Sequence, residues 1–124
     1  MPYDVMNLLK RGFGEHDRLA DEVAMASDTT YEVTYEVPSG EIWIVRAVAV
    51  ESPGDSGSYA YVWAIMSGGS YGVRIAVATA GGRDVVSDLF LPLKEGDKIY
   101  IKAYNASGVQ QYLLYMIGIT KIKV

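Results

Sequence analysis

The chain has 124 residues, of which 50% are apolar and 21% are charged, a composition typical of one folded domain with a hydrophobic core. Its formal net charge is −4 and it contains no cysteine. The charge argues against general electrostatic binding to nucleic acid, and the lack of cysteine excludes disulfides and thiolate chemistry. No run of about 18 apolar residues is present, so we expect no membrane-spanning helix.

Residues 1–28 differ in pattern from the rest and are interpreted as an N-terminal arm, separate from a domain at residues 29–124. The first residues do not have the pattern of a signal peptide. Residues 15–27 begin with acids and place Leu19, Val23 and Ala26 at helical spacing, which predicts a short helix with one apolar stripe. Such a helix must dock on its own domain or on a neighbouring subunit.

The remainder of the chain has the pattern of β-strands. Residues 30–37 alternate Thr or Glu with Tyr or Val, which predicts a strand with one buried and one solvated face. Residues 42–50 and 59–66 are apolar on nearly every position, which is typical of strands covered on both sides. Turn residues separate these segments, and Gly118 marks a candidate β-bulge. The pattern predicts an all-β fold: an antiparallel, jelly-roll-like β-sandwich of about seven to eight strands.

The strands that are apolar on both faces carry more apolar surface than a two-layer sandwich can bury, because each sheet covers only one face of the other. The surplus apolar surface predicts a homo-oligomer. The ten tyrosines and two tryptophans also favour a homo-oligomer, since Tyr tolerates half-burial at interfaces. Strand propensity alone is the other explanation for the tyrosines.

Five aromatic residues are the candidate interface or ligand-binding residues. Tyr59, Tyr61 and Trp63 share one face of a strand, and this face could be a wall of the core, a subunit interface or a sugar-stacking platform. Tyr100 and Tyr104 alternate with Ile99, Ile101 and Ala103, which indicates that they face outward.

No group of residues has the pattern of a catalytic, metal or cofactor site, so we expect no enzyme activity and no cofactor. His16 is the only histidine, too few for a triad or a zinc site. Asp84 and Asp88 could share a strand face, but an isolated carboxylate pair is usually solvated edge charge. Asp55 lies in a Gly/Ser loop without the series of ligands that calcium needs.

Two motifs carry a resemblance to a known family. Residues 35–41 read YEVPSGE, a strand that ends in V-P-x-G, and residues 91–101 read LPLKEGDKIYI, an L-x-x-G-D-x-I-x-I corner. With a Gly-rich hairpin region between them, they resemble small jelly-roll β-sandwich virion proteins of tailed phages and other viruses, over residues of about 30–124. The resemblance implies a capsid-decoration, head-fibre or tail-accessory role, a homotrimer, and a major capsid or tail protein as partner.

We therefore expect a viral structural protein that is made in the host cytoplasm and located in the virion, with no nucleic acid or membrane partner. The alternative is a carbohydrate-binding or other ligand-binding β-sandwich module. In the first reading the N-terminal arm attaches to the particle or to a neighbouring subunit. The apolar residues expected to do so are Val5, Leu8, Leu9, Phe13, Leu19 and Val23.

Overall fold

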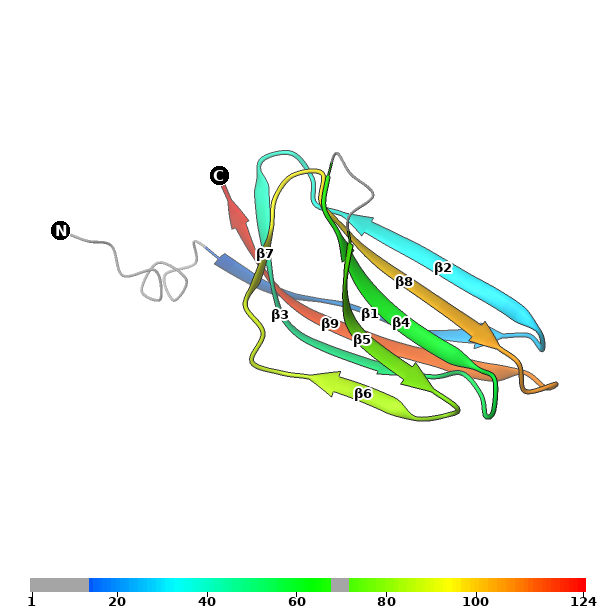
Figure 1. The fold of residues 1–124 in the computed structure, drawn as a ribbon. Helices are drawn as coiled ribbons and strands as arrows, with labels where there is room; N and C mark the ends of the chain where they lie inside the picture. Colours follow the sequence, from blue (N-terminus) through cyan, green and yellow to red (C-terminus); the bar gives the residue numbers. More distant parts are fainter. Residues whose placement is uncertain (1–13, 68–71) are drawn as a thin grey trace.

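The computed structural model describes residues 14–67 and 72–124, which form nine β-strands and no helix (Figure 1). No helix among these residues could cross a membrane. The strands are β1 (Gly14–Met25), β2 (Thr29–Glu36), β3 (Glu41–Glu51), β4 (Tyr59–Ile65), β5 (Gly72–Thr79), β6 (Arg83–Val86), β7 (Leu91–Leu93), β8 (Lys98–Asn105) and β9 (Gln111–Lys123).

Two antiparallel sheets pack face to face, which confirms the predicted β-sandwich. One sheet has the order β1-β9-β3-β6, with β7 also paired to β3, and the other has the order β2-β8-β4-β5. The chain passes from one sheet to the other at most of its connections, as in a jelly roll (Figure 1). The core between the sheets consists of buried aliphatic side chains, the largest of which include Leu93, Ile99, Ile101, Leu113, Ile117 and Ile119.

The helix predicted for residues 15–27 is wrong, because this segment is strand β1. It pairs with β9 along its whole length, from Gly14 opposite Ile122 to Met25 opposite Gln111. Leu19 and Val23 are four residues apart, a spacing that puts them on one face of a helix and equally on one face of a strand. Both side chains pack against the core of the same sandwich. Strand β1 is therefore part of the same sandwich as the strands that follow it.

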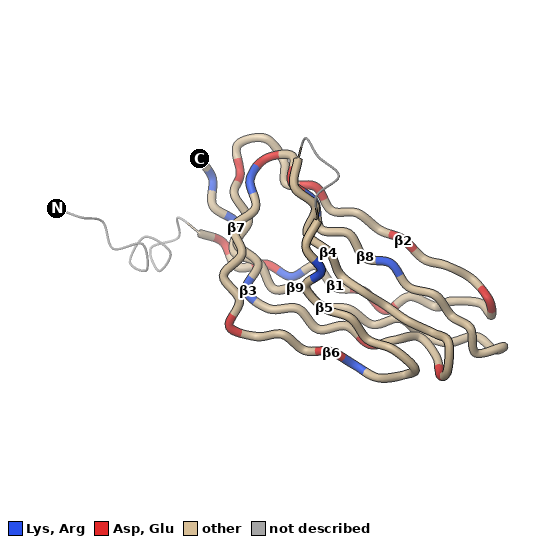
Figure 2. The backbone as a smooth tube through the Cα atoms, viewed as in Figure 1, with Lys and Arg blue, Asp and Glu red and all other residues tan. Residues whose placement is uncertain are grey.

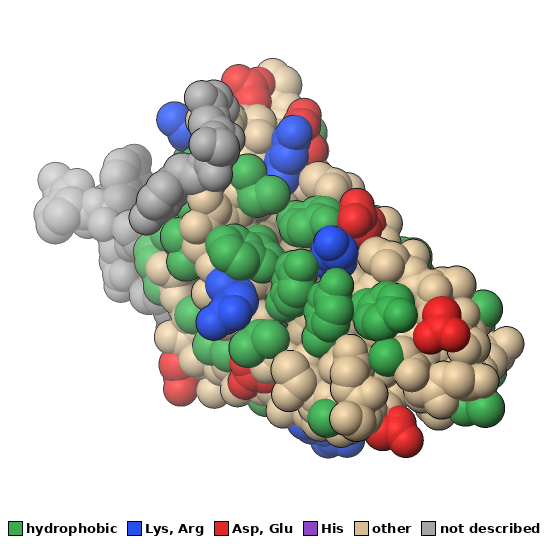
Figure 3. Space-filling view, turned by 45° about the vertical axis from the view of Figure 1, so that its right-hand side comes forward, with side chains coloured by type: hydrophobic (Ala, Val, Ile, Leu, Met, Phe, Trp, Pro, Cys, Tyr) green, Lys and Arg blue, Asp and Glu red, His purple; other side chains and the backbone are tan. Residues whose placement is uncertain are grey.

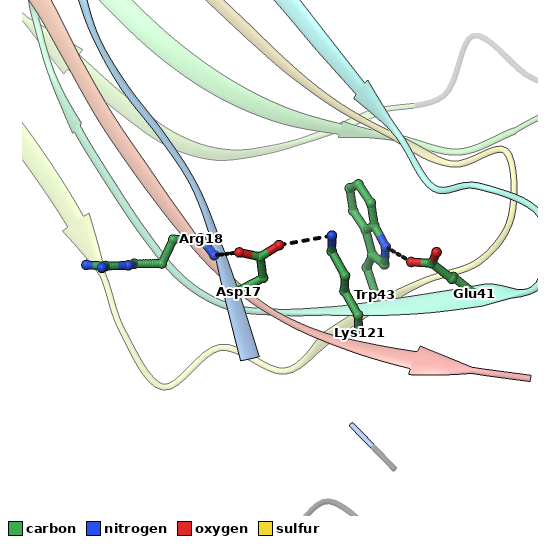
Figure 4. A network of polar contacts seen from close by, with 5 residues as sticks. All are labelled: Asp17, Arg18, Glu41, Trp43 and Lys121. Atoms are coloured by element: carbon green, nitrogen blue, oxygen red, sulfur yellow. Dashed lines mark hydrogen bonds and ion pairs between the residues drawn. The ribbon is translucent and has the colours of Figure 1, made fainter. Parts of the chain in front are cut away.

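A chain of polar contacts holds the start of β1 against the neighbouring strands (Figure 4). The Asp17 carboxylate lies 3.0 Å from the Lys121 ammonium on β9, and this ammonium lies 5.4 Å from the centroid of the Trp43 ring on β3. The Trp43 indole N–H donates to Glu41 over 2.9 Å. The bond from Lys121 holds the pKa of the Asp17 carboxyl below its usual value.

The two motifs that carry the family resemblance meet at one end of the sandwich. The Val37 N–H donates to the Asp97 carbonyl over 2.9 Å, and the Gly96 N–H donates to the Val37 carbonyl over 3.0 Å. Gly96 adopts a φ of +86°, which glycine takes at no steric cost. The buried Asp97 carboxylate accepts the backbone N–H groups of Ser67 and Lys94 over 2.8 and 2.9 Å.

The irregularity expected at Gly118 lies on the opposite strand. The register of β3 against β9 shifts between Val45 and Ala47, and Ala47 lies opposite Gly118. Ile117 and Ile119, on either side of Gly118, are both buried. The bulge is therefore in β3, and the apolar side of β9 stays the same through Gly118.

Candidate functional site

The five aromatic residues singled out in the sequence lie together on the outer surface of the four-stranded sheet, which we call the aromatic face. Tyr59 lies opposite Tyr104, and Trp63 lies opposite Tyr100, on the paired strands β4 and β8. The members of the aromatic face are Tyr59, Tyr61, Trp63, Tyr100 and Tyr104. Figure 3 shows hydrophobic side chains gathered on this side of the molecule, with acidic groups toward its margins.

Alternation along β4 settles which side of the strand is the core. Ala60, Val62 and Ala64 are fully buried, so the aromatic side chains between them point away from the core and are half-buried. The inward side chains of β4 are thus small, and its large aromatic side chains lie on the outer surface of the sheet. The interpretation of Tyr59, Tyr61 and Trp63 as a wall of the core is therefore wrong.

Four of the five rings of the aromatic face lie close to one another. The Tyr59 and Tyr61 rings are stacked, with centroids 5.3 Å apart and planes at 8°. Tyr104 lies 5.9 Å from Tyr59, and Trp63 meets Tyr61 edge to face at 6.3 Å. Because the stacked rings cover part of each other's faces, they form a continuous apolar ridge with hydroxyl groups at its edge.

One cation, Lys102, lies opposite Tyr61 in the aromatic face. The neighbouring Tyr61 and Tyr59 raise the pKa of the Lys102 ammonium above the usual value for lysine. Its partner is Glu32 on β2, at 3.9 Å, and the next pair along these strands is Lys98 with Glu36 at 3.8 Å. Partial burial, followed by the Glu32 charge, raises the pKa of Tyr100. The charges beside the ridge thus form pairs between β2 and β8, and Figure 2 shows acidic positions on β2 and a basic position on the neighbouring β8.

A second apolar surface lies on the outer side of the five-stranded sheet, and we call it the apolar hollow. It has a volume of about 540 Å³. Val85, Leu114 and Met116 contribute side chains that are 61%, 37% and 36% exposed. The remaining lining residues are Ala20, Ala49, Val50, Tyr115, Asp21, Glu22, Glu51 and Arg83.

The apolar hollow could not be predicted from local patterns, because it is built from four strands, most of which are distant from one another in the sequence. Ala20 lies opposite Met116, Met116 opposite Ala49, and Ala49 opposite Val85, so one row crosses β1, β9, β3 and β6. A helix at residues 15–27 would not have placed Ala20 in this row. The apolar outer positions of β9, Leu114 and Met116, were the available signal.

The titratable residues considered as chemical sites lie apart from one another or have structural partners. His16 Nδ1 lies 3.2 Å from the Thr120 hydroxyl, and the Asp84 carboxylate accepts the Val77 N–H over 3.0 Å. Asp88 lies beyond the end of β6 with a φ of +57°, so it does not share a strand face with Asp84. Asp55 is exposed. Within residues 14–67 and 72–124, no three acidic or histidine side chains are grouped as metal ligands.

No protein-family model and no curated protein matches the chain. Solved structures with a similar fold include Bacillus endospore appendages, described as disulfide-linked pili, at 15% identity and a TM-score of 0.47 over 90% of this chain and 88% of that one. The Drosophila NLP core, described with pentamer formation and histone binding, has 19% identity and a TM-score of 0.42 over 84% and 98%.

A viral capsid structure is also among the similar folds. Infectious bursal disease virus, Gt strain, has 12% identity and a TM-score of 0.45, over 89% of this chain and 33% of the viral one. At these values the likeness concerns the β-sandwich architecture alone.

Proposed function

We propose that the chain is a structural subunit of a virus particle that associates with copies of itself through the aromatic face. The observation that carries the proposal is the position of the five aromatic side chains, on the outer surface of a sheet whose inner surface already packs on a complete core. Tyr and Trp are the residues enriched at the centres of protein interfaces. Burial of this ridge in a subunit contact would remove its apolar area from water.

The assignment to a virus particle rests on the two corner motifs and the family they resemble. Their contact through Val37, Gly96 and Asp97 gives both motifs one structural role at the same corner. By the same resemblance, the assembly is a homotrimer that decorates or extends a phage capsid or tail, bound to a major capsid or tail protein. Its location is then the virion.

Mass spectrometry of purified particles from the source of the sequence tests the virion assignment. We expect the chain to remain with the particles through a density gradient at a fixed ratio to the major capsid protein. Its absence from such particles, while it is present in the infected-cell lysate, would contradict the assignment.

Carbohydrate binding is the second candidate, favoured by the polar groups beside the rings. Lys102, Glu32 and Arg74 could bind sugar hydroxyls next to Trp63 and Tyr104. A glycan array separates the two candidates, with Trp63→Ala and Tyr104→Ala as controls. Binding that both substitutions abolish would support the carbohydrate module, and no binding to any glycan would remove it.

A further inference from the structure

Outward side chains change in charge along the direction of β1, from just before the apolar hollow to its far end. The first row contains Arg18, which lies opposite Gly118. Two residues further along β1, the row is apolar and contains Ala20 and Met116. After two more residues it is acidic, with Glu22 and Glu51 on either side of Leu114. Arg18 lies just outside the hollow, whose lining begins with the apolar row and becomes mainly acidic at its far end.

The acidic end of the hollow contains more carboxylates than cations. Glu51 lies 3.8 Å from the exposed Arg83 guanidinium, while Asp21 and Glu22 also line the hollow on the β1 side. Three carboxylates and one guanidinium thus surround the acidic end. A ligand that presents apolar groups to Ala20 and Met116 and cations to this end would match the hollow along its length.

The N-terminal segment of the chain carries the complementary order. Asp4 comes first, four apolar residues follow within the next five positions, and two cations come last. In chain order the segment is Asp4, Val5, Met6, Asn7, Leu8, Leu9, Lys10 and Arg11. When the segment runs in the same direction as β1, its apolar and basic parts match the apolar and acidic parts of the hollow, and its acid is directed toward Arg18 just outside the hollow.

We propose that the apolar hollow binds residues 4–11 of a second copy of the chain, oriented parallel to β1. Lys10 and Arg11 then lie beside Glu22 and Glu51, Leu8 and Leu9 cover Ala20 and Met116, and Asp4 lies beside Arg18. The proposal rests on the proposed self-association and gives it a contact separate from the aromatic face.

An extended hairpin of the chain's own segment over its own sheet would reverse the match of charges. A segment that reversed near Gly14 to cover its own sheet would run opposite to β1. Lys10, four residues before Gly14, would then lie level with Arg18, four residues after it, and like charges would meet. Asp4 would lie beyond the acidic end, near Ala24. A second copy can place its segment in the parallel direction without this conflict.

Cross-linking tests the proposal directly, because the natural chain contains no cysteine. One variant carries Leu9→Cys and the other carries Met116→Cys, and the two are mixed under mild oxidation. We expect a disulfide-linked heterodimer whose junction peptides join positions 9 and 116 in mass spectrometry. Ala20→Cys replaces Met116→Cys as a second acceptor, which keeps the test valid if one substitution disturbs folding.

Two controls separate a specific contact from random collision. Val109→Cys lies at an exposed position in the β8–β9 connection, so it should cross-link to Leu9→Cys several-fold less than the hollow positions do. Lys10→Glu with Arg11→Glu should lower the yield at the hollow several-fold. Glu22→Lys with Glu51→Lys in the acceptor chain should restore it.

Each outcome decides between the possible occupants. A chain that carries both Leu9→Cys and Met116→Cys and closes only as a monomer would overturn the proposal in favour of its own segment. Yields no higher than with Val109→Cys at both acceptor positions would overturn it entirely. Light scattering on the cysteine-free chain reports self-association independently. An oligomer that gives no cross-link at the hollow would therefore refute this contact and leave the aromatic-face proposal intact.

Discussion

The side-chain amide of Asn105 donates to the backbone carbonyl of Met25 over 3.0 Å, although 80 residues separate them in the sequence. The same amide reaches the carbonyls of Ala26 and Val109 at 3.2 and 2.8 Å. Its oxygen accepts the Ser107 N–H over 2.9 Å. The fully buried Asn105 side chain therefore connects the β1–β2 turn to the β8–β9 turn.

Asn105→Ala should be among the most destabilising single substitutions in the chain. It leaves several backbone groups without hydrogen-bond partners, and each buried group left unpaired lowers the free energy of unfolding by about 1–3 kcal/mol. We expect the free energy of unfolding in urea to fall by about 2–4 kcal/mol. Gln110→Ala, at an exposed position of the same turn, should change it by less than about 0.5 kcal/mol. Equal effects of the two substitutions would contradict the role given to Asn105.

Tyr115 should make the fold sensitive to alkali. Its hydroxyl lies 2.6 Å from that of Tyr35 on the other sheet, and burial, followed by this bond, strongly raises the pKa of Tyr115. Because the folded pKa lies above the unfolded value of about 10, the stabilisation is complete below pH 10 and is lost as the pH rises further. The free energy of unfolding should therefore decline above pH 10.

Urea titrations between pH 8 and 11 measure this loss. Tyr115→Phe removes the ionising group, so its unfolding free energy should decline less steeply above pH 10 than that of the natural chain. The exposed Tyr112→Phe serves as the matched control and should retain the natural slope. Parallel declines in all three proteins would show that Tyr115 does not cause the alkaline sensitivity.

Asp17 should titrate below the ordinary range for an aspartate. The hydrogen bond from Lys121, followed by the Arg18 N–H, lowers the pKa of the Asp17 carboxyl. A lowered folded pKa contributes stability above the unfolded value, and this contribution is lost as the pH falls. Carboxyl chemical shifts followed by NMR should show the low pKa, and Lys121→Met should raise it. An unchanged midpoint in Lys121→Met would contradict the contact drawn in Figure 4.

Local patterns predicted those parts of the fold that depend on neighbouring residues. The alternation of residues 30–37 is seen in β2, where Tyr31, Val33 and Tyr35 are half-buried and the intervening residues are exposed. The turn at residues 94–97 needed a glycine at Gly96, and its φ of +86° agrees. In both cases the signal is a periodicity or a turn requirement, which the sequence carries locally.

Features that depend on distant strands could not be predicted in this way. The spacing of Leu19 and Val23 fits a helix and a strand equally, and only the pairing with β9 selects the strand. The role of Asn105 depends on carbonyls about 80 residues earlier. The aromatic face was predicted in its composition, but its outward direction follows from the burial of Ala60, Val62 and Ala64 on the other side of β4.

The central claim is that the aromatic face joins copies of the chain, and molar mass by light scattering on a sizing column tests it most directly. The natural chain should elute as a stable oligomer, a trimer by the family resemblance. In a chain that also carries Lys10→Glu and Arg11→Glu, which weaken the second proposed contact, Tyr61→Ser with Trp63→Ser should shift it to a monomer with an unchanged circular dichroism spectrum. Tyr112→Ser, an exposed aromatic position on the opposite sheet, should leave the oligomer intact. A monomeric natural chain, or an oligomer that survives the double substitution, would contradict the account.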